Sequence, residues 1–459
     1  FAVLEAWMEY SMERRSIRAA ESAHKLLNKM LKPRANSSMP LPFLKTAHFD
    51  VVLQAYAEHG GPEAAKLAQE LLLQMLDTYR SNDSNQRRFM KPTIKSFNIT
   101  LKCWARSGVP DAGTKADELI DILQQWNDED RTTNVQIDER TLVSWIEAWA
   151  HSPKQAPERA SYILNKAMLG QDPAFRNVQL DVAVFNAVIH AWVQSRRGRT
   201  AAVAAEDVLQ SLISSNSQLP NVRTYSMILS AWAQCEGAEG SGDAAEHCEE
   251  ILSKMVNLYR NGNGVKPNTI LFTTCVAAWS KAARNCDLAP ERAERMWRTL
   301  QQLFRESNND PDFYPSTEIG NAVISAWSRC RQRADSVERA QQCLEELKPN
   351  EDLISYNTVL DAMARQKQGQ EAQKLLAWLE SHEKHRPDLF SYNSVLAALS
   401  RVHTNHNESA FQATELLRKM DRLGHVRPNK VSFTGTLWDA ILYCRLSLLL
   451  CSRPECLGS

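Results

Sequence analysis

The sequence carries no excess of charge of either sign and no long apolar run. Lys and Arg together number 54, and so do Asp and Glu, which leaves a formal net charge of +0. A balanced chain has no overall attraction to nucleic acid, so any basic surface has to come from the local placement of cations. No apolar stretch approaches the roughly 20 residues that a membrane-spanning helix needs, and we therefore expect no membrane partner.

Cysteine pairs with metal-binding spacing are also missing. The 10 cysteines are scattered, and no two of them form a Cys-x-x-Cys motif. Cys103, Cys248, Cys275 and Cys343 each lie within an apolar helical pattern, where a free cysteine behaves as a small buried hydrophobe. This distribution of cysteines predicts a reducing compartment, with neither a disulfide framework nor a zinc site.

Combinations of residues that carry catalysis are missing as well. No His-x-Glu motif is combined with paired cysteines, which excludes the signature of a zinc deaminase. No acidic cluster resembles a metal-dependent nuclease, no glycine-rich loop could cradle a phosphate, and the 11 histidines are dispersed. We therefore expect no enzymatic activity, no catalytic residues, no metal and no cofactor.

What the sequence does contain is a pattern of eight residues that recurs along the chain. It reads aromatic, small polar, any, apolar, apolar, any, small, large apolar, and we call the small polar residue the marker. Clear copies occupy residues 97–104, 185–192, 225–232, 272–279, 320–327, 356–363 and 392–399, and weaker copies start at Phe49, Leu142 and Phe433. The markers Asn321, Asn357 and Asn393 are 36 residues apart, which gives the bare unit, and the other units carry polar insertions. Such an array buries each unit against its neighbours.

Each copy of the pattern has the periodicity of a first helix in a helical hairpin, with apolar residues at helical spacing. A second apolar pattern follows, as in Ala413-x-x-Leu416-Leu417-x-x-Met420, and then a proline ends the hairpin because it cannot continue a helix. A Ser or Thr directly before the aromatic residue is expected to cap the first helix. These predicted caps are Ser96, Thr141, Thr224, Ser355, Ser391 and Ser432.

The unit resembles the pentatricopeptide repeat. The resemblance rests on the bare length near 36 residues, on the second-helix pattern, and on junctions such as Arg386-Pro387-Asp388-Leu389-Phe390-Ser391-Tyr392-Asn393. The tetratricopeptide repeat is the alternative, but its Trp-Leu-Gly-Tyr pattern is missing. The resemblance extends from residue 1 to about residue 440 and is closest to the P class of the family, with degenerate repeats. It implies an all-α fold, a right-handed superhelical solenoid of about ten helix-turn-helix repeats.

The predicted repeats divide the chain into eleven parts. These are a partial repeat over 1–45, nine repeats over 46–93, 94–138, 139–181, 182–221, 222–268, 269–316, 317–352, 353–388 and 389–429, and a partial repeat with an irregular end over 430–459.

In this family the marker and the residue just before the next unit together read one base of a single-stranded RNA, about one base per repeat. Asn suits this task because its amide both donates and accepts hydrogen bonds. The resemblance assigns base reading to Asn98, Asp138, Asn186, Asn221, Ser226, Asn268, Thr273, Asn321, Asp352, Asn357, Asp388, Asn393 and Asn429. The alternative for either position alone is structural, an Asn that caps a helix or an Asp or Asn that makes a turn after proline. Their joint recurrence favours base reading.

The family's pairing rule also gives a target. The pairs Asn98–Asp138, Asn321–Asp352 and Asn357–Asp388 would prefer uracil, Asn186–Asn221 and Asn393–Asn429 a pyrimidine, more often cytosine, Ser226–Asn268 adenine, and Thr273–Ser316 a purine. The pairs Asp50–Thr93 and Val143–Asp181 fit no rule. Read 5′ to 3′ along the chain, the predicted target is any-U-any-pyrimidine-A-purine-U-U-C.

Two further positions carry over from the family. An apolar side chain three residues before the marker stacks on the base, and this role falls to Ile270, Ile354 and Phe390. Other repeats break the pattern at this position with Lys95, Arg140, Arg223 and Glu318. A cation eight residues after the marker resembles the family's phosphate contact, and this position holds Arg106, Lys281, Arg329, Arg365 and Arg401. The alternative for these cations is a solvated helix end, where they suit the helix dipole.

A row of tryptophans lies six residues after the marker. Its members are Trp7, Trp104, Trp149, Trp192, Trp232, Trp279, Trp327 and Trp438. Such a row could stack on bases. However, it lies within the apolar stripe that faces the partner helix, so we predict that these side chains form the core.

The sequence therefore predicts sequence-selective binding of single-stranded RNA, in transcript stabilisation, processing or translation. From the resemblance we expect a monomer in a mitochondrion or plastid, with single-stranded RNA and organellar proteins as partners. The alternative is a helical-repeat protein-interaction scaffold within an organellar complex such as a ribosome. The balanced charge and the long insertions favour that alternative.

Overall fold

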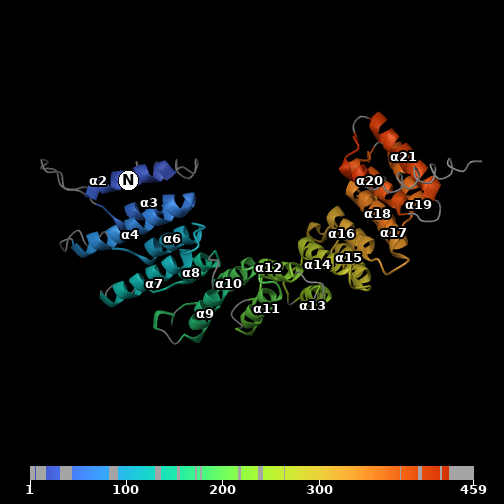
Figure 1. Ribbon diagram of the computed structural model, residues 1–459. Coiled ribbons are helices and arrows are strands. Elements are labelled where there is room, and N and C mark those ends of the chain that lie inside the picture. The colour runs from blue at the N-terminus through green and yellow to red at the C-terminus, as the bar shows by residue number, and fades with distance from the viewer. Residues whose placement is uncertain are drawn as a thin grey trace, which may run out of the picture. The chain divides into compact units, whose positions relative to one another are not determined.

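All regular elements in the described parts of the chain are helices (Figure 1). The computed structural model describes residues 6, 17–31, 44–81, 91–129, 136–151, 156–170, 173–175, 178–215, 219–235, 241–262, 264–382, 384–401, 406–423 and 426–433. The predicted all-α class is therefore confirmed. Most of the predicted partial repeats at the two ends, with Trp7 and Trp438, lies outside the described residues.

The helices follow one another with short connections. In chain order they are α2 (Ile17–Leu31), α3 (Thr46–His59), α4 (Pro62–Ser81), α6 (Ile94–Ala105), α7 (Ala112–Glu129), α8 (Glu139–Ala150), α9 (Ala156–Leu169), α10 (Val182–Gln194), α11 (Arg199–Ser214), α12 (Val222–Ala233), α13 (Ser241–Arg260), α14 (Thr269–Ala282), α15 (Ala289–Glu306), α16 (Thr317–Arg329), α17 (Ser336–Leu347), α18 (Leu353–Arg365), α19 (Gly369–Ser381), α20 (Leu389–Ser400) and α21 (His406–Leu423). Two single 3-10 turns, η1 (Pro173–Phe175) and η2 (Pro311–Phe313), precede α10 and α16.

The chain forms two compact units, residues 1–231 and 232–459, and each is a stack of helical hairpins. In the first unit, α3, α6, α8 and α10 pack side by side as first helices, and α4, α7 and α9 each contact the first helix before and after them. In the second unit, α14, α16, α18 and α20 form the corresponding row, with α15, α17 and α19 packed between successive members. Each unit is therefore a helical-repeat solenoid, while the right-handed superhelix stays a prediction.

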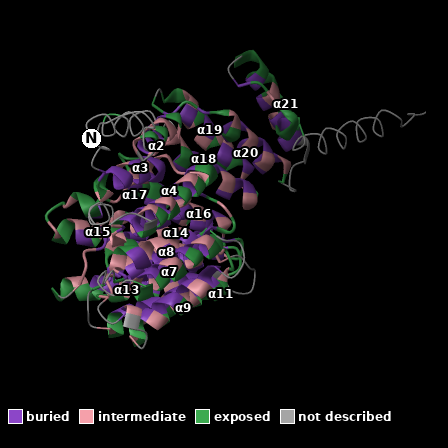
Figure 2. Cartoon of the chain, turned by 90° about the vertical axis from the view of Figure 1, so that its left-hand side faces the viewer, coloured by how far each residue is buried: buried purple, intermediate pink, exposed green. Residues whose placement is uncertain are grey.

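Burial alternates along each helix, and the purple positions in Figure 2 mark the residues that form the core. The predicted cysteines Cys103, Cys248, Cys275 and Cys343 are all buried there, and burial raises the pKa of the Cys103 thiol to about 12. Their interpretation as small core hydrophobes is thus confirmed.

The tryptophan row also belongs to the core, as predicted. All its described members, Trp104, Trp149, Trp192, Trp232, Trp279 and Trp327, are buried. Several of their indole N–H groups donate to the second helix of the preceding hairpin. Trp104 Nε1 donates to Gln69 Oε1 at 2.8 Å, and Trp192 Nε1 donates to Ser161 Oγ at 2.9 Å. The row therefore joins neighbouring hairpins, and its buried rings are not exposed for stacking on bases.

The first helices begin earlier than the sequence suggested. The N-cap of α18 is Asp352, whose carboxylate accepts from the Ser355 backbone N–H at 2.8 Å, and Ser355 lies three residues inside the helix. The same arrangement holds for Asp138 with Thr141 at α8. The predicted Ser and Thr caps are therefore wrong, because an acidic group at the helix start accepts the free N–H and also suits the helix dipole. Ser355 Oγ instead accepts from the Asp352 backbone N–H at 3.2 Å.

Candidate nucleic-acid interface

Three predicted base-reading pairs lie in direct contact. Asn98 Nδ2 donates to Asp138 Oδ1 at 2.9 Å. The equivalent bonds run from Asn321 Nδ2 to Asp352 Oδ1 at 3.1 Å and from Asn357 Nδ2 to Asp388 Oδ1 at 3.2 Å. The marker lies in the second turn of one first helix and the carboxylate caps the next. The side-by-side packing of first helices therefore brings together residues that are far apart in sequence.

A hydroxyl group of the following repeat completes each of these clusters. Thr141 Oγ1 donates to Asn98 Oδ1 at 2.7 Å, and Ser355 Oγ donates to Asn321 Oδ1 at 2.5 Å. The other Asn markers have the same partner, with Ser391 bonded to Asn357 at 2.6 Å, Thr224 to Asn186 at 2.7 Å, and Ser432 to Asn393 at 2.6 Å. This third member was not expected from the sequence, because a Ser or Thr at this position fits a cap of its own helix.

The carboxylate of Asp352 is held in its charged form. Burial alone would raise the pKa of Asp352, but hydrogen bonds from the Ser355 backbone N–H, the Asn321 amide and the Ser355 hydroxyl outweigh burial and lower that pKa. The cluster therefore combines a fixed negative charge with an oriented amide at the start of a helix.

In the repeats whose junction residue is Asn, that residue also caps the next first helix. Asn221 Oδ1 accepts from the Thr224 backbone N–H at 3.0 Å, and Asn429 Oδ1 accepts from the Ser432 backbone N–H at 3.1 Å. Asn268 caps α14 in the same way, with its Oδ1 3.2 Å from the Leu271 backbone nitrogen.

The two markers that are not Asn behave differently. Thr273 Oγ1 donates to the Thr269 carbonyl at 2.9 Å within its own helix. Ser226 lies in the first unit and Asn268 in the second, so their predicted pairing stays a prediction. The nucleotides assigned to these two repeats therefore rest on the resemblance alone.

The predicted stacking residues are exposed although they are apolar. Ile270 is 64% exposed, Ile354 63% and Phe390 54%, and each lies in the first turn of a first helix. At the same position, Lys95, Arg140, Arg223 and Glu318 are exposed charged residues. The exposure of the three apolar side chains leaves them accessible to a ligand. Stacking on bases itself stays a prediction.

Most of the predicted phosphate-binding cations bond to the backbone of the preceding repeat. Arg106 Nη1 donates to the Ala57 carbonyl at 3.1 Å, and Arg401 Nη1 donates to the Ala364 carbonyl at 3.1 Å. Lys281 and Arg329 make equivalent bonds to the carbonyls of Ala233 and Ser280, at 2.7 and 3.3 Å. Each carbonyl lies in the last turn of a first helix, which favours a cation. These side chains therefore have a structural role, and their contact with phosphate stays a prediction.

Two of the five cations form ion pairs with carboxylates. Arg106 Nη1 is 3.2 Å from Glu58 Oε2 of the preceding repeat, and Arg365 Nη2 is 2.7 Å from Asp361 Oδ2 in the same helix. The side chain of Arg365 is only 25% exposed. A neutralised cation of this kind attracts phosphate less strongly than a free one.

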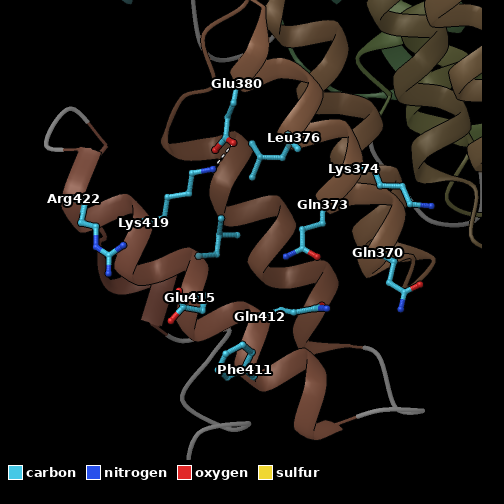
Figure 3. Close-up of a pocket in the computed structure, with 12 residues that line it drawn as sticks. Gln370, Gln373, Lys374, Leu376, Glu380, Phe411, Gln412, Glu415, Lys419 and Arg422 are labelled. Atoms are coloured by element: carbon cyan, nitrogen blue, oxygen red, sulfur yellow. Dashed lines mark hydrogen bonds and ion pairs between the residues drawn. The ribbon is translucent and has the colours of Figure 1, made fainter.

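A groove lies between the second helices α19 and α21 (Figure 3). It has a volume of about 760 Å³ and is lined by Gln373, Leu376, Phe411 and the ion pair of Glu380 with Lys419, among others. Its walls come from second helices, whereas the predicted base-reading residues lie on first helices and at their caps. The groove is therefore separate from the candidate interface.

Two kinds of site are not found in the described parts of the chain. There, no group of three or more His, Cys, Asp or Glu side chains is arranged to hold a metal ion. Over the same residues, no helix is both long enough and apolar enough to cross a membrane.

Comparison with known proteins identifies the repeat. The family model described as "PPR repeat" matches residues 354–377, which comprise most of α18 and the first part of α19. A chloroplastic pentatricopeptide repeat-containing protein of Arabidopsis thaliana is 27% identical over 158 residues, 33% of this chain. The chain therefore contains a segment that matches the pentatricopeptide repeat. The match spans 26% of that relative's length, about a quarter of it.

Two solved structures of pentatricopeptide repeat proteins are more distantly similar to the chain. The pentatricopeptide repeat protein PPR10, in complex with an 18-nucleotide psaJ RNA element, is 16% identical, with a TM-score of 0.40 over 94% of this chain and 60% of that one. PPR10 from maize is 13% identical, with a TM-score of 0.30 over 97% of this chain and 86% of that one.

Proposed function

We propose that this protein binds single-stranded RNA selectively, and that each Asn marker reads one nucleotide together with its junction residue. The contact between marker amide and junction carboxylate in three repeats carries the proposal. Two residues that must act on one base have to lie side by side, and Asn321 Nδ2 is 3.1 Å from Asp352 Oδ1. Neither a cap nor a turn requires an Asn at the marker.

The chemistry of each cluster supports base reading. An Asn amide has two donor protons, and only one of them is used by the bond from Asn321 to Asp352. The hydrogen bonds from Asn321 and Ser355 to the Asp352 carboxylate all end on Oδ1. A donor beside an acceptor complements the edge of uracil, which offers a carbonyl oxygen next to an N–H group. Ile354 and Phe390, exposed on successive first helices, would cover the two faces of the base.

We also propose a binding role without catalysis, in which the bound protein stabilises a transcript, directs its processing or promotes its translation. An organellar location follows from the family, and the chloroplastic relative favours a plastid over a mitochondrion.

A titration with RNA tests the proposal. The predicted nine-nucleotide core would be compared with a scrambled RNA and with the double variant Asn357→Ala and Asn393→Ala. Loss of two base contacts is expected to weaken binding by at least about tenfold. Affinity should also fall steeply with salt, because phosphate contacts release counterions.

The control variant is Thr358→Ala. Its exposed hydroxyl donates only to the Ile354 carbonyl of the same helix, at 2.7 Å, so binding should not change. Equal, weak binding to every RNA would refute base reading, and the protein-interaction scaffold would then become the better interpretation.

A further inference from the structure

The residue two positions before each marker varies together with the marker of the preceding repeat. Wherever the preceding marker is Asn or Asp, this residue is Ser or Thr. The pairs are Asp50 with Ser96, Asn98 with Thr141, Asn186 with Thr224, Asn321 with Ser355, Asn357 with Ser391, and Asn393 with Ser432. Where the marker is another residue, the position is apolar, as in Val143 with Val184, Ser226 with Leu271, and Thr273 with Ile319. A residue needed only by its own helix would not follow its neighbour's marker.

Hydrogen bonds explain why these two positions vary together. All five Asn markers accept a hydrogen bond from the hydroxyl of the next repeat, and Asp50 Oδ1 accepts one from Ser96 Oγ at 2.7 Å. These hydroxyl-bearing residues are buried. Water therefore does not compete for their bonds, and in the repeats with an Asn marker the second acceptor for the same proton is the Oδ1 of the N-cap residue.

The hydroxyl fixes which end of the amide is free. Its oxygen accepts from the backbone N–H of the N-cap residue, as Ser391 Oγ does from Asp388 N at 3.1 Å. Ser391 Oγ is also 2.6 Å from the marker's Oδ1 and 3.0 Å from Asp388 Oδ1, so the shorter of its two donated contacts goes to the marker. The marker's Oδ1 is thereby occupied, and its NH₂ group is turned toward other partners. Without the hydroxyl, the amide could rotate by about half a turn and present an acceptor instead of a donor.

Repeats differ in how strongly they depend on this bond. Asn98 is oriented twice, by the Thr141 hydroxyl and by Asp138, which accepts from its NH₂ group. In the described part of the chain, Asn186 has Thr224 as its one side-chain partner, because its junction residue Asn221 uses its own Oδ1 for the cap. The amide of Asn186 therefore depends on a single hydroxyl.

We propose that this Ser or Thr hydroxyl is a positioning residue for RNA reading: by orienting the marker amide of the preceding repeat, it sets the base preference of that repeat. The inference rests on the RNA binding proposed above. It means that the choice of each base depends on three side chains rather than two, and that the third belongs to the next repeat.

Isosteric variants test the proposal at two repeats. Thr224→Val and Thr141→Val remove the hydroxyl without changing the volume much, and the chain already places a buried Val184 at the equivalent position. Thr100→Val is the matched control, because Thr100 is buried and its hydroxyl donates only to the Ser96 carbonyl of the same helix at 3.0 Å. Thr224→Ser keeps the hydroxyl and should rescue the loss. Each protein would be titrated with core RNAs that carry each base in turn at nucleotides 2 and 4.

The expected result is specific to the nucleotide. Thr224→Val should lower the preference for pyrimidine over purine at nucleotide 4 by about fivefold, the value of one net hydrogen bond, and leave nucleotide 2 unchanged. Thr141→Val should affect nucleotide 2 alone and less strongly, because Asp138 still orients Asn98. Thr100→Val and Thr224→Ser should match the unmodified protein.

Two outcomes would overturn the proposal, and they differ from failure of the proposed function. If Thr224→Val weakens binding to all RNAs equally, or leaves the preference at nucleotide 4 intact, the hydroxyl has only a structural role. If the unmodified protein prefers no base at any nucleotide, RNA reading itself is wrong, and the positioning role is excluded with it.

Discussion

A glycine beside a buried tryptophan gives the sharpest test of the packing. Gly113 lies in α7, and a Cβ atom added there would be 2.3 Å from Trp149 Cδ2 and 2.6 Å from Cε3. Ordinary contacts between carbon atoms are about 3.5–4 Å, so the helix and the ring would have to separate by more than about 1 Å. The ring cannot simply rotate, because Trp149 Nε1 donates to Asp117 at 2.9 Å.

The magnitude follows from two opposing terms. Replacing Gly by Ala inside a helix gains about 1 kcal/mol from helix propensity. Overpacking of a filled core costs about 1–3 kcal/mol, and an overlap with a rigid ring belongs at the upper end of that range. Gly113→Ala should therefore lower the free energy of unfolding by about 1–2 kcal/mol.

Two other glycines make a graded series. At Gly320 the added Cβ would meet Leu347 Cδ1 at 2.6 Å, the end of a side chain that can rotate, so Gly320→Ala should be nearly neutral. At Gly242 the added Cβ would meet no heavy atom of the described residues within 4 Å beyond its chain neighbours and its own helix backbone, so Gly242→Ala should stabilise by up to about 1 kcal/mol. Urea denaturation followed by far-UV circular dichroism would compare the three transition midpoints. If Gly113→Ala proved as stable as Gly242→Ala, the described packing of α7 against α8 would be wrong.

Three further predictions concern charged groups. Burial raises the pKa of Asp50 above its ordinary value, which means that the folded protein favours the protonated carboxyl. The contribution of Asp50 to stability is therefore full below its unfolded-state pKa and is lost as the pH rises through its folded-state pKa. Asp50→Asn should hence stabilise the protein at pH 7 in urea denaturation and lose that advantage below about pH 4; equal gains at both pH values would contradict this. Glu294 is buried and accepts hydrogen bonds from two arginines and an indole N–H. Glu294→Gln should therefore lower the free energy of unfolding by about 1–3 kcal/mol, whereas Glu338→Gln, at an exposed position, should leave it unchanged in the same assay. Arg401→Gln should reduce the slope of log affinity for RNA against log salt by about 0.7, and an unchanged slope would limit Arg401 to its bond with the backbone.

The helices, the core and the pairing of code residues could all be derived from the sequence. Helical periodicity places Trp232 and Trp327 in the apolar stripe, and both are buried. The resemblance to the pentatricopeptide repeat implied that Asn357 and Asp388 act together, and they are bonded in the structure. These features depend on local pattern or on the regular repetition of one unit, both of which a single sequence records.

Contacts between repeats were harder to predict. The bond from Arg401 to the Ala364 carbonyl depends on how closely α18 and α20 pack, which periodicity alone does not specify. The hydroxyl of Ser355 was assigned to its own helix because a Ser before a helix is usually a cap. The sequence nevertheless shows that a Ser or Thr at this position accompanies an Asn or Asp marker in the preceding repeat. Ser355 and Asn321 are such a pair, 34 residues apart.

The hydrogen bond from Ser355 to Asn321 has a consequence for how such chains can be cut and joined. It crosses the boundary between two repeats, close to the proline break where a repeat would naturally be divided. A segment excised at that break leaves behind the hydroxyl that orients its own last marker. A transplanted repeat therefore acquires whatever residue the host supplies at that position, a hydroxyl or an apolar side chain such as Ile319. The smallest segment that carries its own hydrogen-bonding pattern extends beyond one repeat, into the first turn of the next.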